Sequence, residues 1–366
     1  MKLSIQREVL LKPLQQVIGA VEKRHTMQIL SNVLLRCDGT HLKITATDLE
    51  VELVAELEYA SEETGEVTLP ARKLLDICRA LPDEAEIRIQ VSGERAVLSS
   101  GRSRFVLTTL PAGDFPNLDE IESRIEFSLT ERELLTLIGR TSFAMANQDA
   151  RYYLNGLMLE VEKGTIRTVA TDGHRLSLCT LKSIVETEET QQVIIPRKGV
   201  LELSRLLEHS DDPVRIQIAA NHLRVRVVGL CFTTKLIDGR FPDYKRVIPR
   251  DGEQVLKVDR ELLRQALGRT AILSNEKYRG VRFELSPGTL KIQSHNPEQE
   301  EAEEELEVDY SGESLEIGFN VTYLMDVVAN LQGEVLEATF KDPGSSVLIR
   351  DLGFQDALNV VMPMRL

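Results

Sequence analysis

Apolar residues follow two periods along this chain, one typical of half-buried strands and one typical of amphipathic helices. IRIQV (87–91) and VRIQI (214–218) alternate strictly between apolar and polar residues, which predicts strands with one buried face. Three longer segments each begin as a short strand and continue as a polar start followed by an apolar helical stripe: LSIQREVLLKPL (3–14), FSLTERELLTLI (127–138) and LKVDRELLRQAL (256–267). The sequence therefore predicts many short strands interrupted by a few helices.

These elements recur in the same order three times. HLKITATD (41–48), TIRTVATD (165–172) and TLKIQSHN (289–296) align at an offset of 124 residues, so Asp48, Asp172 and Asn296 are equivalent. VTLPARKLLDICRAL (67–81) matches VIIPRKGVLELSRLL (193–207) and, more loosely, IGFNVTYLMDVVANL (317–331). This period is too long for a solenoid, so it predicts three tandem domains: residues 1–125, 126–252 and 253–366.

Each repeat is expected to hold two helices and about eight strands, in the order strand, helix, strands, helix, strands. That order predicts an α+β fold in which the helices cover one face of an antiparallel sheet. A capping box begins at Thr130, and Asp259 and Asn320 are expected N-caps. Pro70 and Pro196 suit the first turn of the second helix, where a proline removes no helical hydrogen bond.

Net charge alone argues against a protein that coats nucleic acid. The chain has 44 Lys and Arg against 58 Asp and Glu, which gives −14. The charge is uneven, however: the three repeats carry −5, +1 and −10. The acidity is concentrated in the last repeat, in the run 296–309, which is typical of a solvated acidic face and lacks the spacing of a calcium loop.

Cations gather on the second helix of the first two repeats. Arg72, Lys73 and Arg79 lie on one helix, and Arg197, Lys198 and Arg205 on the other. A spacing of seven residues, as from Arg72 to Arg79 and from Lys198 to Arg205, is about two helical turns, so both members face the same way. The two helices therefore predict local positive fields in an acidic protein.

Several classes of protein are excluded or disfavoured. No apolar run approaches the roughly 20 residues of a membrane span, and the first residues lack the apolar core of a signal peptide. The four cysteines lie far apart, as expected of buried thiols in a reducing cytosol. Nucleotide-binding, dinucleotide-binding, hydrolase and zinc-peptidase motifs are missing, so we expect no cofactor and no metal. Asp172 and His174 could form an acid–base pair, but the equivalent Asp48 and Asn296 favour a turn role.

Several strings resemble one family over the whole chain. RYYLNG (151–156), TVATDGHRL (168–176), IPRKGV (195–200), DGRFPDY (238–244), ILSNEKYRGVR (272–282), NPEQEEAEE (296–304) and VVMPMRL (360–366), together with the triplication, are similar to the bacterial DNA polymerase III beta subunit, the sliding clamp. The resemblance implies a cytoplasmic, non-catalytic processivity factor. It implies a head-to-tail homodimer, a closed ring of six clamp domains around duplex DNA. Short peptide motifs of the polymerase alpha subunit, the clamp loader, translesion polymerases and repair proteins would bind it.

Simple geometry agrees with two chains per ring. A domain of 122 residues, one third of the chain, has a diameter of about 35 Å when treated as a uniform sphere. Three such spheres enclose a hole of only about 5 Å, whereas six enclose about 35 Å, enough for duplex DNA and water.

The resemblance implies three sets of functional residues. DNA contacts carried over from the family are Arg24, Arg72, Gln148, Tyr152 and Tyr153, to which the helix argument adds Lys198 and Arg205. Dimer contacts are Lys73, Arg102, Arg104, Phe105 and Leu107 on the first repeat, facing Ile272, Leu273, Glu300, Glu301 and Glu304 on the third. The apolar members should supply most of the stability and the charges the orientation.

The third set is a hydrophobic cleft for partner peptides. Its matching positions are Leu154, Thr171, Gly173, His174, Arg175, Leu176, Pro242, Arg246, Val247, Asn320, Tyr323, Ser346, Val360, Val361, Met362, Pro363, Met364 and Arg365. The sequence departs from the family pattern at Met27 and Gln28, where relatives commonly have proline nearby, and at Gly344 near the cleft rim. A peptide-docking scaffold that never encircles DNA, or a metal-dependent nuclease that uses the carboxylates, are the alternative functions.

Overall fold

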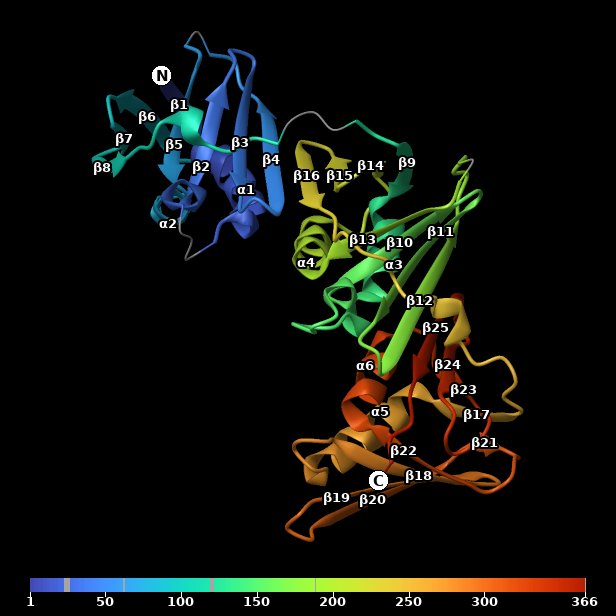
Figure 1. The fold of residues 1–366 in the computed structure, drawn as a ribbon. Coiled ribbons are helices and arrows are strands. Elements are labelled where there is room, and N and C mark those ends of the chain that lie inside the picture. Colours follow the sequence, from blue (N-terminus) through green and yellow to red (C-terminus); the bar gives the residue numbers. More distant parts are fainter. Residues whose placement is uncertain (23–26, 62, 119–121, 188, 366) are drawn as a thin grey trace. The chain divides into compact units, whose positions relative to one another are not determined.

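The chain repeats one order of elements three times. The computed structural model describes residues 1–22, 27–61, 63–118, 122–187 and 189–365. Within these residues each repeat contains a strand, an α-helix, four strands, a second α-helix and three strands, and the third repeat adds one two-residue strand (Figure 1). Short 3-10 helices lie in the connections between them. The predicted two helices and about eight strands per repeat are therefore confirmed.

The elements have the following bounds. The first repeat comprises β1 Lys2–Gln6, α1 Arg7–Val17, β2 Asn32–Cys37, β3 His41–Thr47, β4 Val51–Glu58, β5 Gly65–Pro70, α2 Ala71–Ala80, β6 Glu86–Ser92, β7 Arg95–Ser100 and β8 Ser103–Thr108. The second comprises β9 Ile125–Thr130, α3 Glu131–Gly139, β10 Gly156–Glu162, β11 Thr165–Thr171, β12 Arg175–Lys182, β13 Gln191–Pro196, α4 Arg197–Leu206, β14 Pro213–Ile218, β15 His222–Val227 and β16 Leu230–Lys235. The third comprises β17 Gln254–Asp259, α5 Arg260–Thr270, β18 Gly280–Ser286, β19 Thr289–His295, β20 Glu301–Glu307, β21 Asp309–Tyr310, β22 Leu315–Asn320, α6 Val321–Asn330, β23 Val335–Phe340, β24 Val347–Asp351 and β25 Phe354–Val361.

Side-chain caps begin two of the helices, as predicted. Asp259 accepts a hydrogen bond from the backbone N–H of Leu262 at 2.8 Å, and Asn320 accepts from the N–H groups of Thr322 and Tyr323. Each cap satisfies backbone donors that have no partner within the first helical turn. The prolines differ slightly from the prediction. Pro70 and Pro196 each end the strand before the helix, because both still pair across the sheet.

The chain divides into two compact units whose borders differ from the borders of the repeats. One unit holds Met1–Arg132 and Leu201–Leu236, and the other Glu133–Val200 and Ile237–Leu366. The first unit contains a sheet of order β1-β6-β7-β8 and a second of order β5-β2-β3-β4-β16-β15-β14-β9, all antiparallel in the described residues. Helix α1 lies against β3 and β4, and α2 against β2 and β5.

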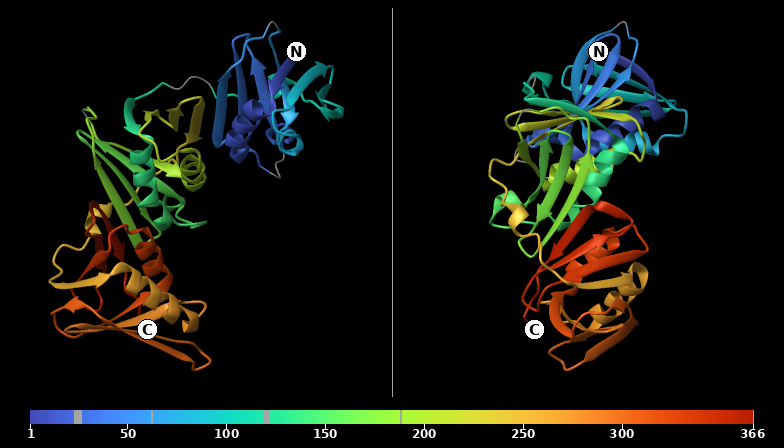
Figure 2. Two further views of the ribbon diagram at one scale, coloured as in Figure 1. Left: turned by 180° about the vertical axis from the view of Figure 1, so that it is seen from behind. Right: turned by 90° about the vertical axis from the view of Figure 1, so that its right-hand side faces the viewer.

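Strands of two different repeats meet inside each unit. In the first unit β4 pairs with β16, with Glu52 opposite Thr233. In the second unit β12 pairs with β25, with Leu176 opposite Val360, within the order β13-β10-β11-β12-β25-β24-β23-β17-β21. The remaining sheet has the order β20-β19-β18-β22, and α5 lies against β20 and α6 (Figures 1 and 2).

Aliphatic residues fill the cores, and three of the four predicted buried cysteines, Cys37, Cys78 and Cys179, are buried with them, whereas Cys231 is half-buried. The core of the third repeat adds the rings of Phe283, Phe319 and Phe340 to this packing. Burial raises the pKa of Cys78 and of Cys179 to about 11, which keeps both thiols protonated. None of the helices in the described ranges combines the length and apolar character that a membrane span requires.

A buried ion pair connects the second repeat to the third. The Arg140 guanidinium, just beyond α3, donates to Asp351 at 3.1 Å and to the carbonyl of Asn330 at 2.8 Å. Both side chains are at least 95% buried. Burial alone would raise the pKa of Asp351. Backbone N–H groups, led by Gln332, and the Arg140 guanidinium outweigh that effect and lower it. The Phe354 ring, 4.6 Å from the guanidinium carbon, adds a cation–π contact.

Replacing Asp351 with Asn should destabilise the protein by about 3–5 kcal/mol at neutral pH, because the buried guanidinium loses its counter-charge. Urea unfolding of both proteins measures this difference. Since the pKa of Asp351 is lowered on folding, its contribution is complete above the unfolded pKa near 4 and is lost as the pH falls further. The difference between the proteins should therefore shrink in acid. D211N, at an exposed partner of Arg132, is the control and should unfold like the parent; an equal effect of both changes would contradict the prediction.

Candidate functional site

A tight turn between β11 and β12 forms one wall of the predicted cleft. Oδ1 of Asp172 accepts hydrogen bonds from the N–H groups of His174 and Arg175, at 2.9 and 3.0 Å. Oγ1 of Thr171 donates to the carbonyl of Arg175 and accepts from the N–H of Gly173. Gly173 has φ of +89°, which favours glycine.

The first repeat contains the same turn with one decisive difference. Asp48 accepts from the N–H groups of Glu50 and Val51, and Thr47 makes the same two bonds as its counterpart in the second repeat. Leu49 takes the position of Gly173, at φ of +76°, and packs against the apolar cluster around Leu30. The second repeat has no side chain at this position, and the Arg151 guanidinium lies against Gly173 instead.

The predicted turn role is confirmed in all three repeats, since Asn296 likewise accepts from the backbone N–H of Glu300. The acid–base alternative fails on geometry. Oδ2 of Asp172 accepts from Nε of Arg175 at 3.1 Å, while the His174 ring stacks on Tyr323. Among the described residues no group of three or more His, Cys, Asp or Glu side chains could hold a metal.

An apolar pocket of about 170 Å³ lies beside this turn. Nine of the residues predicted for the cleft line it: Leu154, Thr171, Gly173, Arg175, Leu176, Pro242, Val247, Val360 and Met362. The backbone connects the two sides, because the N–H of Met362 donates to the carbonyl of His174 at 2.9 Å. The pocket thus lies where strands of the second and third repeats meet.

Three further lining residues were missed as cleft residues: Arg151, Tyr153 and Tyr244. Arg151 donates to both carboxylate oxygens of Asp149, at 3.0 and 2.9 Å, and to the carbonyl of Asp172. This pairing lowers the pKa of Asp149 to about 2. A Cβ on Gly173 would stand 2.9 Å from Arg151 nitrogens, so the glycine also makes room for the guanidinium.

The signal for these three residues in the sequence was weak. Tyr153 was predicted to contact DNA, yet its half-buried side chain lines the pocket. Tyr244 is held by a hydrogen bond of 2.8 Å from its hydroxyl to the buried carboxylate of Glu160. That partner lies 84 residues away, and no local pattern indicates it.

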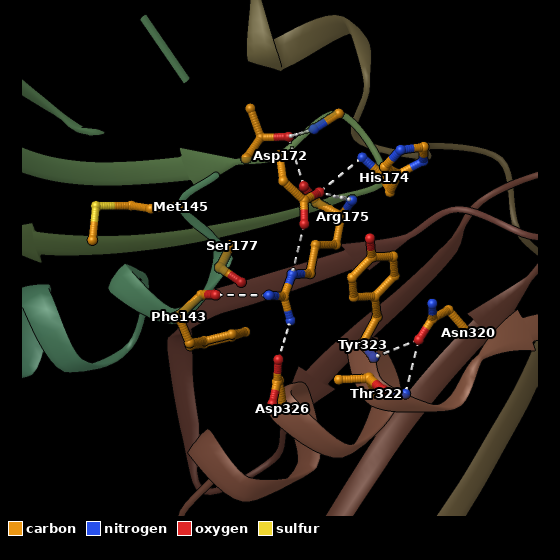
Figure 3. A network of polar contacts seen from close by, with 12 residues as sticks. Phe143, Met145, Asp172, His174, Arg175, Ser177, Asn320, Thr322, Tyr323 and Asp326 are labelled. Carbon is orange, nitrogen blue, oxygen red and sulfur yellow. Dashed lines mark hydrogen bonds and ion pairs between the residues drawn. The ribbon is translucent and has the colours of Figure 1, made fainter. Parts of the chain in front are cut away.

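Arg175 joins the turn to the third repeat (Figure 3). Its guanidinium donates to Asp172, to Asp326 on α6 at 2.5 Å and to the carbonyl of Phe143 at 2.8 Å. It also lies 4.7 Å from the ring centre of Tyr323, over which the His174 ring is stacked at 6.1 Å. Arg175 therefore fixes the cleft wall as well as lining it.

The other predicted cleft residues lie on neighbouring elements with different exposure. Asn320 caps the N-terminus of α6, and Tyr323 in the first turn of this helix stacks with His174 (Figure 3). The N–H of Met364 donates to the carbonyl of Gly318 on β22. Val361 is fully buried in the core of the third repeat, so its side chain is not at the surface. The remaining members are exposed or half-buried: Arg246, which pairs with Asp243, Ser346, Pro363 and Arg365.

The predicted DNA contacts fall in both units. In the first unit Arg72 donates to the carbonyl of Val21 at 3.0 Å, and Arg205 donates to the carbonyls of Gln15 and Gln16 at the end of α1. In the second unit the exposed ring of Tyr152 meets that of Tyr153 edge-on at 5.7 Å. Gln148 is exposed with φ of +57°, Lys198 is half-buried on α4, and Arg24 lies outside the described residues.

The predicted dimer contacts lie on the edge strands β8 and β20, in the turns before these strands, on α2 and in the 3-10 helix Ala271–Leu273 that follows α5. On and near β8, Lys73, Arg102 and Arg104 are exposed, Phe105 is half-buried and Leu107 is buried. Near β20, the Ile272 side chain is 76% exposed and Leu273 is half-buried. Glu300 and Glu301 are exposed, whereas Glu304 accepts two hydrogen bonds from Arg269, at 2.6 and 2.7 Å. This intrachain partner of Glu304 was not predicted.

Comparison with known proteins gives one consistent result over the whole chain. Family models match in order: DNA polymerase III beta subunit N-terminal domain at residues 1–119, central domain at 128–243 and C-terminal domain at 245–365. The beta sliding clamps of Pseudomonas aeruginosa and Escherichia coli are 54% and 53% identical, with both chains of each pair fully covered.

Solved structures agree with the family models. A crystal structure of the DNA polymerase sliding clamp from Pseudomonas aeruginosa superposes with a TM-score of 0.98 at 53% identity, with both chains fully covered. The beta subunit from Caulobacter crescentus gives 0.94 at 41% identity, also with full coverage of both chains. With its three clamp domains in tandem, the chain belongs to the DNA polymerase III beta subunit family, the bacterial sliding clamps.

Proposed function

We propose that two copies of this chain join head to tail into a closed ring of six domains around duplex DNA. The ring tethers the replicative polymerase and other DNA-processing proteins, and it has no catalytic activity of its own, which answers the nuclease alternative. The protein would act in the cytoplasm. Each copy would contribute three domains to the ring, residues 1–125, 126–252 and 253–366.

Strand pairing between successive repeats is the observation that supports the proposed ring. The strand β4 of the first repeat pairs with β16 of the second, and β12 of the second pairs with β25 of the third. By the same rule β20 of the third repeat should pair with β8 of a first repeat. Within the described residues β8 and β20 each pair on one side only. Since open strand edges attract a further strand, a second copy is the expected partner.

The β4–β16 pairing, which we call the first joint, also predicts the register in which β20 and β8 would pair. The β12–β25 pairing is the second joint, and the proposed β20–β8 pairing is the third. Glu52 lies opposite Thr233, and the equivalent residues are Glu301 on β20 and Val106 on β8. Continuing antiparallel, Glu303 would face Arg104, which gives opposite charges across the interface. On the helix side, Phe105 and Leu107 would meet Ile272 and Leu273.

Changing Leu273 to Asp should yield monomers, because a carboxylate would be buried in the apolar part of this contact. Sedimentation velocity at micromolar protein measures the mass. A leucine outside the proposed contact, the exposed Leu352, provides the control L352D, which should stay dimeric. A persistent L273D dimer would exclude this interface.

DNA is held by topology and by weak, sequence-independent contacts. The proposed contacts are Arg24, Arg72, Gln148, Tyr152, Tyr153, Lys198 and Arg205. Arg205 is engaged with α1 in the present structure, so the exposed Tyr152 is the better supported member of this set.

The test of encirclement uses nicked circular DNA and the same DNA linearised. After loading by a bacterial clamp loader with ATP, the protein should stay on the circle through gel filtration and slide off the linear form. A peptide-docking scaffold that does not encircle DNA would show no difference between the two forms.

The apolar pocket beside Gly173 is the proposed docking site for partner peptides. Its extent includes the predicted residues on α6 and the C-terminal strand, and one such cleft per chain would give two per ring. The clamp of Pseudomonas aeruginosa has been solved bound to griselimycin, which makes this compound a suitable probe.

Gly173→Ala should weaken griselimycin binding at least tenfold, because the new Cβ would stand 2.9 Å from nitrogens of Arg151, a residue that lines the pocket, and the guanidinium must shift. Calorimetric titration measures the affinity. The matched control is Gly164→Ala, at φ of +75° in the turn after β10, where the nearest atom to a Cβ is 3.8 Å away. Both changes should cost about 1–2 kcal/mol of stability for the left-handed backbone. Equal affinities of the two variants for griselimycin would show that Gly173 is not part of the docking site.

A further inference from the structure

The end of helix α1 is held by an arginine from the second repeat. Arg205 donates through Nη1 to the carbonyl of Gln15 at 3.2 Å and through Nη2 to that of Gln16 at 2.7 Å. Its Nε bonds Glu202 at 3.0 Å, which orients the guanidinium. A Cβ on Gly19 would collide with Glu202, so the two segments approach closely.

This contact has a clear physical basis. The last carbonyls of a helix have no partner within the helix, and its C-terminus carries a partial negative charge. A planar guanidinium can donate to two carbonyls at once, and it is attracted to that charge. Arg205 therefore fastens the first repeat to the second at the helix layer, beside the β4–β16 pairing.

The junction between the second and third repeats also has an arginine at a helix C-terminus, but here the arginine follows a first helix and binds the end of a second helix. Ala329 occupies the position of Arg205, so α6 has no cation to offer there. Arg140, which follows α3 and is equivalent to Gln16, instead donates to the carbonyl of Asn330 at the end of α6. An arginine at a helix C-terminus thus accompanies the strand pairing at both joints within the chain.

At the proposed third joint, between the third repeat of one copy and the first repeat of the other, an arginine again occupies the position of Arg205. Arg79 on α2 is equivalent to Arg205, and Asp76 is equivalent to Glu202. The Arg79 side chain is exposed, and no hydrogen bond or ion pair of its guanidinium is found within the described residues. On α5, the counterparts of Gln15 and Gln16 are Gly268 and Arg269.

We propose that Arg79 of one copy donates to the last-turn carbonyls of α5, those of Gly268 and Arg269, in the second copy. The contact would fasten the ring at the helix layer, as Arg205 fastens the first joint within the chain. This inference rests on the proposed dimer, and it adds a specific polar contact to the predicted apolar one. A Cβ at Gly268 would meet no atom within 4 Å outside the backbone of the helix, so no side chain crowds this last turn. The carbonyl of Arg269 accepts from the N–H of Ala271, and a carbonyl oxygen has a second lone pair that can accept from the guanidinium.

The experiment is a dilution series in sedimentation velocity on the full chain, which gives the dissociation constant of the dimer. Arg79→Ala should raise this constant tenfold to a hundredfold, since charge-assisted hydrogen bonds contribute about 1.5–3 kcal/mol and tenfold corresponds to 1.4 kcal/mol. Arg79→Lys should recover only part of the loss, because an ammonium cannot donate in a planar fork. Arg36→Ala removes the same charge from β2, at an exposed pair with Glu66, and should leave the constant unchanged.

Two outcomes would overturn the inference, and they differ from failure of the ring. A dissociation constant for R79A within twofold of the parent and R36A values excludes a contact of this residue. An equal loss in R79A and R36A would assign the effect to net charge alone. If the unchanged chain were monomeric at all concentrations, or did not stay on circular DNA, the proposed function itself would fail.

Discussion

The backbone N–H and C=O groups at the edge of a sheet require hydrogen-bond partners, and this requirement determines how the three repeats are joined. Each repeat presents one edge strand to the next repeat, and β4–β16 and β12–β25 convert two pairs of edges into continuous antiparallel sheet. The borders of the compact units follow these pairings rather than the borders of the repeats, since β16 belongs to the unit of the first repeat. The repeats are therefore joined by shared sheets as well as by sequence.

Arginine side chains add contacts between the repeats at helices and turns that lie outside the paired strands. Arg140 connects α3, α6 and the turn at Asp351, while Arg175 connects the cleft wall to Asp326. Both guanidinium groups are largely buried, and each forms an ion pair with a carboxylate of the third repeat, at 3.1 Å for Arg140 and 2.5 Å for Arg175. Because one of these residues also lines the pocket, the shape of the docking site depends on the same contacts that hold the second repeat to the third.

Features set by local chemistry or by the repeat could be predicted from the sequence. The caps at Asp259 and Asn320, the turn at Asp172 and the alternating strands all follow from residues within a few positions of one another. Nine pocket residues followed from the family resemblance. Features that depend on distant partners could not be predicted. Helical spacing indicates which way Arg205 faces, but it gives no information that the end of α1 lies there. Likewise, Arg269 reaches Glu304 across 35 residues of chain.

The pairing of β4 with β16 has a consequence during synthesis on the ribosome. Translation proceeds at about 5–20 residues per second, so the 172 residues from Glu58 to Leu230 take roughly 9–34 s to emerge. Throughout that interval the nascent first repeat exposes the apolar and hydrogen-bonding edge of β4 without its partner. The half-made chain therefore carries an open strand edge that the finished chain has closed, and this is the stage at which unwanted strand pairing is expected.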